Sequence, residues 1–422
     1  MGTRFRFLPG LAAQFFPVRV SLVLALLLPV LLLGWNACTS SNSTTTSSTG
    51  ALFVATQGDS LVSAFSIDLT TGALTANGTG VATGTVPSAM IAAPSGTTLF
   101  VANSNPSVPA NSPACTLPSP GTITAYTVKS DGTVTAVSGS TTAGSIPLSM
   151  AIDSGGHFLF VANQGLQCNS ASGTISVFSI KDTTLTEVAG SPFTAAAPLA
   201  PTDPGPSGIA VTPDGKFVYV ANEFDGTVTG FSVDTTSGTL TRGATLLAGT
   251  APAGVGMTPD GGFLYVANSG SSNVSAFSIC NQVVTNCNDP NNPDGSLNVI
   301  AGSPFPAGLG PAFAIAAPSG KFLFVVNRLS NQISQYKIAS GTGVLSANTQ
   351  ATISSGLNPV WATARAGTTV VTATSGTTDF LFVANFGAST ISVYGYDSTV
   401  GILGLLGAPV TSGGQPSAVA AE

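Results

Sequence analysis

The chain has 422 residues, of which only 7% are charged, and its 11 Lys and Arg against 17 Asp and Glu give a formal net charge of −6. This acidic balance argues against a nucleic-acid-binding protein, and the 43% of hydrophobic residues argue against a disordered one. The length alone suggests two or three domains, but an internal repeat points to a single one.

Residues 1–37 are predicted to be a secretion signal, because three arginines precede an apolar run over residues 20–34. Cleavage before Cys38 would resemble the processing of a bacterial lipoprotein, in which this cysteine carries the lipid. An ordinary secretory signal and an uncleaved anchor are the alternatives. Residues 38–50, almost all Ser and Thr after Cys38, are expected to be a flexible tether.

These features predict an exported protein that is periplasmic or at the cell surface. Loss of the three leader arginines leaves 8 basic against 17 acidic residues, so no nucleic-acid partner is expected. No other apolar run is long enough to span a bilayer, so we expect membrane contact only through the lipid anchor. We expect a monomer.

From residue 51 to residue 422 the chain repeats one apolar strand, typified by the sequence LFVAN. The mean spacing is about 55 residues, a period typical of solenoids and propellers. The seven copies end at Thr56, Asn103, Asn163, Asn222, Asn268, Asn327 and Asn385.

One unit shows the pattern of strands. Residues 206–211 read as a strand of small residues, and Pro213-Asp214-Gly215 as a tight turn. Residues 216–222 form a nearly continuous apolar strand, which predicts burial on both faces. A third strand over residues 226–233 and a fourth from Thr239 complete four antiparallel strands, which is the composition of a propeller blade.

The two ends of the repeat region predict how the ring closes. The first unit lacks the small-residue strand before Leu52, and residues 416–421 supply that strand at the other end. We therefore predict an all-β, seven-bladed β-propeller over residues 51–422, with four-stranded antiparallel blades and closure by the C-terminal strand. Closure removes an open sheet edge that would otherwise promote aggregation.

Besides Cys38, four cysteines follow the leader and can oxidise in an exported protein. Of three possible pairings, we favour Cys115 with Cys168 and Cys280 with Cys287. Zinc is the rival explanation, but no Cys-x-x-Cys motif exists and His157 is the sole histidine. The acidic segment 288–294 has oxygen ligands for calcium but breaks the EF-hand spacing, so no metal and no cofactor are expected.

The strand (L/V)(F/Y)VAN, the preceding PSGIAV and TPDG and the following TISVFSI resemble the lactonase family of seven-bladed propellers, which includes 6-phosphogluconolactonase-like proteins. The strand also resembles the YVTN-type repeat of surface-layer propellers. The resemblance implies a site at the channel mouth, where His, Arg and acidic groups act on a lactone. Here the residues opening the innermost strands are uncharged, which argues against hydrolysis: Ser88, Leu148, Ser207, Ala253, Ala312, Val360 and Ser417.

A second ring is predicted from the residues that follow each strand-ending Asn or Thr. Its charges are Glu223 and Arg328, which with Gln57 and Gln164 are our candidate ligand site, the alternative being solvated loop ends. The full ring is Gln57, Ser104, Gln164, Glu223, Ser269, Arg328 and Phe386.

Other polar and aromatic residues are assigned structural roles. The repeated Asn side chains are expected to cap turns by bonding to the backbone. His157 is expected to be a solvated hairpin residue, and Phe313 and Trp361 are expected to pack the core or channel.

Three functions remain open. The first is a ligand-binding or interaction module at the cell envelope, whose partner is a sugar-like or anionic small molecule or an envelope protein. The second is a lactone hydrolase using Glu223 and Arg328, and the third is a structural repeat protein. Because blade-end loops are usually too wet to raise the pKa of a carboxylate, we expect binding without turnover.

Overall fold

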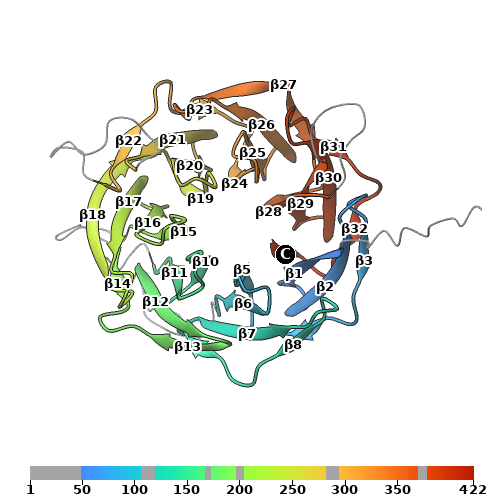
Figure 1. Ribbon diagram of the computed structural model, residues 1–422, viewed down its shortest axis with the longest axis horizontal. Coiled ribbons are helices and arrows are strands. Elements are labelled where there is room, and N and C mark those ends of the chain that lie inside the picture. Colours follow the sequence, from blue (N-terminus) through green and yellow to red (C-terminus); the bar gives the residue numbers. More distant parts are fainter. Residues whose placement is uncertain (1–48, 106–118, 167–172, 196–203, 282–293, 369–377) are drawn as a thin grey trace, which may run out of the picture. The chain divides into compact units, whose positions relative to one another are not determined.

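Seven antiparallel sheets surround a central channel, and all the regular elements of the described residues are β-strands (Figure 1). In this computed structural model the described residues are 49–105, 119–166, 173–195, 204–281, 294–368 and 378–422, within a unit that spans residues 47–422. The predicted leader and most of the tether lie outside them. Among the described residues, no helix has the length and apolar character needed to cross a bilayer.

Three strand positions recur in every blade. The innermost strands are β33 (Pro416–Ala421), β5 (Pro87–Ala92), β10 (Pro147–Ile152), β15 (Pro206–Val211), β19 (Pro252–Met257), β24 (Pro311–Ala316) and β28 (Pro359–Arg365) for blades 1 to 7. The second strands are β1 (Thr49–Thr56), β6 (Thr98–Asn103), β11 (Phe158–Asn163), β16 (Phe217–Asn222), β20 (Phe263–Asn268), β25 (Phe322–Asn327) and β29 (Thr378–Asn385). The third strands are β2 (Leu61–Asp68), β7 (Thr122–Val128), β12 (Thr174–Lys181), β17 (Thr227–Val233), β21 (Asn273–Ile279), β26 (Gln332–Ile338) and β30 (Thr390–Asp397).

The outermost position is continuous in two blades and broken into two short strands in the other five. The continuous strands are β18 (Leu240–Leu247) and β27 (Leu345–Ser354). The broken ones are β3 (Leu74–Ala76) with β4 (Val81–Ala82), β8 (Val134–Ala136) with β9 (Thr141–Thr142), β13 (Thr184–Glu187) with β14 (Phe193–Thr194), β22 (Leu297–Val299) with β23 (Phe305–Pro306), and β31 (Gly404–Leu405) with β32 (Val410–Thr411).

Closure occurs as predicted, because the last strand completes the first blade. Strand β33 pairs antiparallel with β1, from Leu52 opposite Ala421 to Thr56 opposite Pro416. Sheet order in this blade is β3-β2-β1-β33, so the two ends of the repeat region share one sheet. The seven-bladed, closed, all-β architecture is therefore confirmed.

The hydrophobic core lies between neighbouring blades. Seven clusters of buried side chains each combine residues of two adjacent blades. In β1, for example, Phe53 packs toward blade 2 while Leu52 and Val54 pack toward blade 7. Because strand side chains alternate between faces, both faces of the second strand must be apolar, as the continuous apolar motif predicted.

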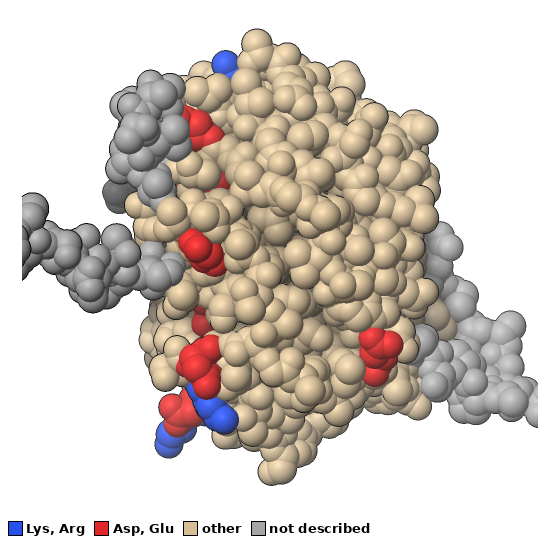
Figure 2. All heavy atoms as spheres, turned by 90° about the vertical axis from the view of Figure 1, so that its right-hand side faces the viewer, with Lys and Arg blue, Asp and Glu red and all other residues tan. Residues whose placement is uncertain are grey.

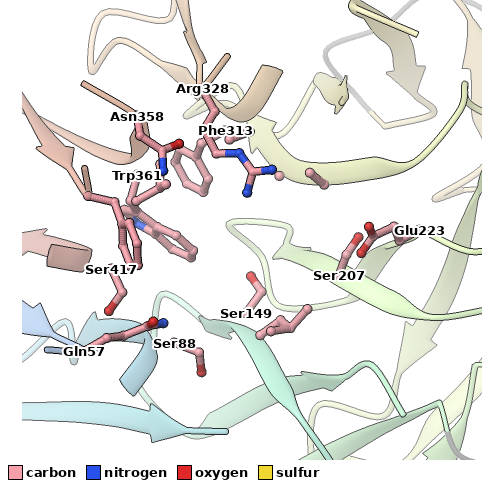
Figure 3. Close-up of a pocket in the computed structure, with 16 residues that line it drawn as sticks. Gln57, Ser88, Ser149, Ser207, Glu223, Phe313, Arg328, Asn358, Trp361 and Ser417 are labelled. Carbon is pink, nitrogen blue, oxygen red and sulfur yellow. The ribbon is translucent and has the colours of Figure 1, made fainter. Parts of the chain in front are cut away.

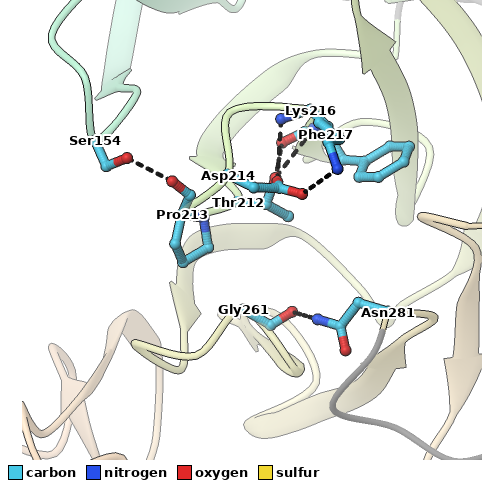
Figure 4. Close-up of polar contacts among 8 residues, drawn as sticks. All are labelled: Ser154, Thr212, Pro213, Asp214, Lys216, Phe217, Gly261 and Asn281. Carbon is cyan, nitrogen blue, oxygen red and sulfur yellow. Dashed lines mark hydrogen bonds and ion pairs between the residues drawn. The ribbon is translucent and has the colours of Figure 1, made fainter.

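The predicted tight turn is present at the hairpin between the first two strands of blade 4 (Figure 4). Asp214 Oδ1 accepts hydrogen bonds from Thr212 Oγ1 (2.6 Å) and Lys216 N (3.1 Å). Gly215 has a φ of +71°, a left-handed conformation that glycine adopts at little cost. The turn sequence thus fixes the register of the hairpin.

Charged groups are sparse on the surface as well as in the sequence. Figure 2 shows one side of the unit, where a few acidic and basic side chains are separated by wide uncharged areas. Between described residues, two ion pairs form, His157 with Asp153 (3.0 Å) and Lys216 with Asp214 (3.3 Å). Stability therefore depends on packing and backbone pairing rather than on surface ion pairs.

The repeated Asn side chains do not cap turns, so that prediction was wrong. They are fully buried and donate mainly to hydroxyl groups of the third strand. Asn222 Nδ2, for example, bonds to Thr227 Oγ1 and Thr229 Oγ1, both at 3.0 Å. A buried amide must find partners, and hydroxyl groups of the adjacent third strand supply most of them.

The carbonyl oxygens of these amides are satisfied unequally. Thr83 Oγ1 donates to Asn103 Oδ1 at 2.9 Å, and Ser355 Oγ donates to Asn385 Oδ1 at 2.8 Å. In the loops that precede blades 3, 5 and 6, the residue equivalent to Thr83 and Ser355 is alanine, at positions 143, 248 and 307. Among the described residues, the oxygens that face these alanine-bearing loops have no partner, namely those of Asn163, Asn268 and Asn327.

Cys280 is disulfide-bonded, which agrees with an oxidised protein. Its partner lies outside the described residues, as do Cys115, Cys168 and Cys287. The pairing of Cys280 with Cys287 and of Cys115 with Cys168 therefore stays a prediction.

Candidate functional site

A bulge at the start of every innermost strand aims one side chain into the channel. In blade 4, Pro206 pairs with Asn222 and Gly208 pairs with Ala221, so Ser207 has no opposite residue. Bulges re-aim side chains in this way and are common beside functional sites. The bulged residues include all seven predicted strand-opening residues: Ser88, Leu148, Ser207, Ala253, Ala312, Val360 and Ser417.

Before the proline that begins each innermost strand stands a residue with a positive φ, and its carbonyl group positions the residue that follows the repeated Asn or Thr. In blade 6, Gly310 has a φ of +62° and its carbonyl accepts the N–H of Arg328 at 2.8 Å. In blade 4, Gly205 does the same for Glu223 at 2.7 Å. This backbone link recurs in all seven blades, with φ between +49° and +67°, at Val86, Ile146, Gly205, Ala251, Gly310, Asn358 and Gln415. Holding β-branched residues in this region costs energy, so the geometry is imposed by the fold.

The two rings enclose a cavity of about 370 Å³ at the channel mouth (Figure 3). All seven bulged residues line it, together with Gln57, Glu223, Arg328 and Phe386 of the predicted ring. This volume lies within the ordinary range for small-molecule sites. Sequence reasoning missed Ser149, Gly254 and Asn358, which also line the cavity. Asn358 could have been recognised from its place before a strand-opening proline.

Glu223 is the acidic group of the mouth, and it is half-buried. Burial raises the pKa of its carboxyl group, outweighing a hydrogen bond from Gln164 and the charge of Arg328, which both lower it. Gln164 Nε2 donates to Glu223 Oε2 at 2.5 Å, so Gln164 supports this carboxylate without lining the cavity. The prediction that this position would be too wet to raise the pKa was therefore wrong.

Arg328 enters the mouth from the end of β25, beside Phe313 (Figure 3). Its side chain is exposed and forms no hydrogen bond or ion pair with any described residue. Phe313 and Trp361 stack on one another, with ring centroids 4.5 Å apart and an angle of 24° between the ring planes. They pack the channel as predicted and also give the cavity an apolar wall beside Arg328.

The remaining ring residues are turned toward backbone groups. Ser104 Oγ donates to the carbonyl of Pro147 and Ser269 Oγ to that of Ala251, each at 3.0 Å. Among the bulged serines, Ser207 Oγ donates to the carbonyl of Pro252 at 2.7 Å and Ser417 Oγ to that of Pro87 at 2.6 Å. The hydroxyls of Ser104, Ser207 and Ser417 link neighbouring blades, whereas that of Ser269 bonds within blade 5. All four donate to backbone carbonyls rather than to a catalytic base.

His157 lies directly before β11, at the opposite end of this strand from the channel mouth. Its side chain is 72% exposed, and Nδ1 lies 3.0 Å from Asp153 Oδ2. The prediction of a solvated hairpin histidine is confirmed. Within the described residues, no group of three or more His, Cys, Asp and Glu side chains could hold a metal ion.

A family model described as "Lactonase, 7-bladed beta-propeller" matches residues 167–286 and 282–421, which together are more than half of the chain. The chain belongs to this lactonase family. A search of curated protein sequences gives no significant match to it.

Solved structures similar to this lactonase-family propeller share its fold over most of their length. The periplasmic gluconolactonase PpgL of Pseudomonas aeruginosa has a TM-score of 0.68 and 21% identity, covering 88% of this chain and 98% of that one. A candidate 6-phosphogluconolactonase of Bacteroides uniformis has a TM-score of 0.66 and 19% identity, covering 89% and 99%. A Lactobacillus plantarum protein has a TM-score of 0.67 and 19% identity, covering 89% and 99%. At these identities the similarity concerns the fold.

Proposed function

We propose that the channel mouth binds a small sugar acid or its lactone, with Arg328 as the anion-binding group. The observation that carries this proposal is the free guanidinium in a cavity of small-molecule size. A guanidinium can hold a carboxylate or phosphate through two parallel hydrogen bonds. The apolar wall of Phe313 and Trp361 offers a surface for the C–H face of a sugar, and Gln57 and Glu223 offer partners for its hydroxyls.

Replacement of Arg328 by Ala is expected to weaken the binding of gluconate by roughly 1.5–3 kcal/mol, as for a lost charge-assisted hydrogen bond. Isothermal titration calorimetry on the purified protein measures this change. Arg242→Ala is the matched control, because Arg242 lies on the outer strand β18 and bonds to Thr245 Oγ1 at 2.6 Å. Binding that ignores both Arg328→Ala and Glu223→Gln would place the site elsewhere.

Hydrolysis of the lactone is a second candidate, favoured by the raised pKa of Glu223. A carboxylate of raised pKa is a stronger base. It would take a proton from water while the water oxygen bonds to the lactone carbonyl carbon. The ring C–O bond then breaks, and the leaving alkoxide takes up that proton from the Glu223 carboxyl group, which gives the open hydroxy acid and restores the carboxylate. Arg328 would stabilise the negative charge on the carbonyl oxygen.

Turnover of gluconolactone well above the spontaneous rate, lost in Glu223→Gln but kept in Glu187→Gln, would favour the enzyme. Glu187 is the matched carboxylate, since it lies on the outer strand β13 and accepts a bond from Ser191 Oγ at 2.9 Å. Gluconate binding without turnover of gluconolactone would favour the binding protein over the enzyme.

We also propose that the chain is exported and carries a lipid on Cys38. The support is the basic and apolar leader followed by a Ser/Thr tether, and the similar fold of a periplasmic gluconolactonase is compatible with it. Cys38→Ala is expected to move the protein out of the membrane fraction. An unmodified Cys38 in the mass spectrum of the wild-type protein would contradict the anchor.

A further inference from the structure

A groove continues from the channel mouth across blades 4 and 5. Its volume is about 760 Å³, and Glu223 lines both this groove and the mouth cavity. Phe224 and Asp225 follow Glu223 into the groove, and the far wall comes from the outer strand of blade 4 and the loops of blade 5. The groove therefore adjoins the mouth at its acidic residue.

The lining of the groove combines hydrogen-bonding groups with apolar surface. Asp225 and Glu223 offer carboxylate oxygens. Asn273 Oδ1 already accepts bonds from Asn268 Nδ2 (2.8 Å) and Ser271 Oγ (3.1 Å), so its amide N–H₂ stays available to donate. Phe224 and Leu247, the latter 80% exposed, supply the apolar surface.

The charges of the groove limit what it can accept. No Lys or Arg occurs among the described residues that line it, whereas two carboxylates do. One oxygen of each carboxylate is already bonded, Glu223 Oε2 to Gln164 and Asp225 Oδ1 to Thr227. An anionic extension would be repelled, and a purely apolar one would leave the other carboxylate oxygens and the amide without partners. A neutral group with many hydroxyls satisfies both conditions, since hydroxyls donate to carboxylates and accept from amides.

The aromatic residue of the groove is not required by the repeat. Phe224 occupies the position two residues after the repeated Asn or Thr, where four other blades have glycine: Gly58, Gly165, Gly270 and Gly387. Phe224 is nonetheless held firmly. Its N–H donates to the carbonyl of Pro204 at 3.0 Å, and its ring packs on Gly205, where an added Cβ would approach it to 2.5 Å.

We propose that the groove is a second subsite, which binds a neutral, hydroxyl-rich extension of the mouth ligand such as a further sugar ring. This inference rests on the proposed function, because the anionic end of the same ligand occupies the mouth beside Arg328. Glu223 then contacts both parts of the ligand. The chemical class is a sugar acid carrying at least one neutral sugar.

The test compares gluconate with lactobionate, which is gluconate carrying a galactose. Calorimetry on the full-length protein is expected to show lactobionate binding about tenfold more tightly than gluconate, the gain of one or two further hydrogen bonds. Phe224→Gly, which installs the residue of the other blades, and Leu247→Ala are expected to bring this affinity ratio toward one. Leu405→Ala is the matched control, since Leu405 is an exposed leucine on the outer strand of blade 7.

The outcomes separate the two proposals. Gluconate and lactobionate binding with equal affinity, or a ratio that both groove variants leave unchanged, overturns the second subsite and leaves the mouth site standing. Failure of both compounds to bind refutes the proposed function itself. Thermal melting of each variant confirms that the ring is intact.

Discussion

Deletion of residues 416–422 is expected to remove most of the stability of the propeller. Strand β33 supplies the innermost strand of blade 1, and its Ala418 and Val419 are at most 2% exposed. The deletion breaks the backbone pairing with β1 and leaves the inner edge of β1 unpaired. It also removes Ser417 Oγ, which bonds to the carbonyl of Pro87 in the next blade at 2.6 Å. A loss of several kcal/mol is a large share of a typical stability of about 5–15 kcal/mol.

Thermal and denaturant unfolding measure the effect. Glu422→Ala is the control, because it keeps the backbone of the strand, including the bonds between residue 422 and Ala51. We expect a clear transition close to the wild-type midpoint for this control, and a low or absent transition for the deletion. A deleted protein that melts at the wild-type temperature would contradict closure as a source of stability.

The architecture could be predicted because the repeat is local and periodic. Each apolar second strand is buried on both faces, and that requirement is visible in the sequence as an unbroken apolar run. Closure could be predicted because the first unit lacks a strand that residues 416–421 supply. The bulges could not be predicted in this way. They depend on a left-handed residue before each proline, such as Val86 or Ile146, and neither residue type favours that conformation.

The candidate site was predicted in outline by counting one residue past each strand end. Gln57, Glu223, Arg328 and Phe386 line the mouth as this counting implies, but Ser104, Gln164 and Ser269 do not. The hydroxyl of Ser104 reaches a carbonyl of the next blade and that of Ser269 a carbonyl of its own blade, and only the tertiary structure shows that these carbonyls are near. Burial raises the pKa of Glu223, and the two groups that oppose this shift, Gln164 and Arg328, lie far from it in the sequence.

The repeated Asn side chains give the second large effect. Asn385→Ala is expected to cost about 3–5 kcal/mol, because Asn385 makes four hydrogen bonds in a buried site at about 1 kcal/mol each, with a cavity added. Nδ2 donates to Thr390 Oγ1 (3.2 Å) and Ser392 Oγ (2.8 Å). Oδ1 accepts from Ser355 Oγ (2.8 Å) and Gly356 N (3.1 Å). Chemical denaturation of the purified variant gives the change in the free energy of unfolding.

Asn327→Ala is the matched comparison, because the same position in blade 6 makes one side-chain hydrogen bond, to Ser334 Oγ at 2.9 Å, and its Oδ1 has no partner among the described residues. Since it makes three fewer hydrogen bonds, we expect it to cost about 3 kcal/mol less than Asn385→Ala. Equal costs would mean that the amide matters for its volume rather than for its hydrogen bonds.

Adding a hydroxyl donor in the loop that faces the amide tests the same hydrogen-bond network. Ser355, in the loop before blade 7, donates to the buried Oδ1 of Asn385, and Thr83, in the loop before blade 2, donates to that of Asn103. Ala307→Ser places a hydroxyl at the equivalent position facing Asn327, and it is expected to stabilise the protein by about 1 kcal/mol. The gain should vanish in the Asn327→Ala background, because the acceptor is then missing. A gain that persists there would show that the serine acts through some other contact, and that the unequal satisfaction of these amides does not limit stability.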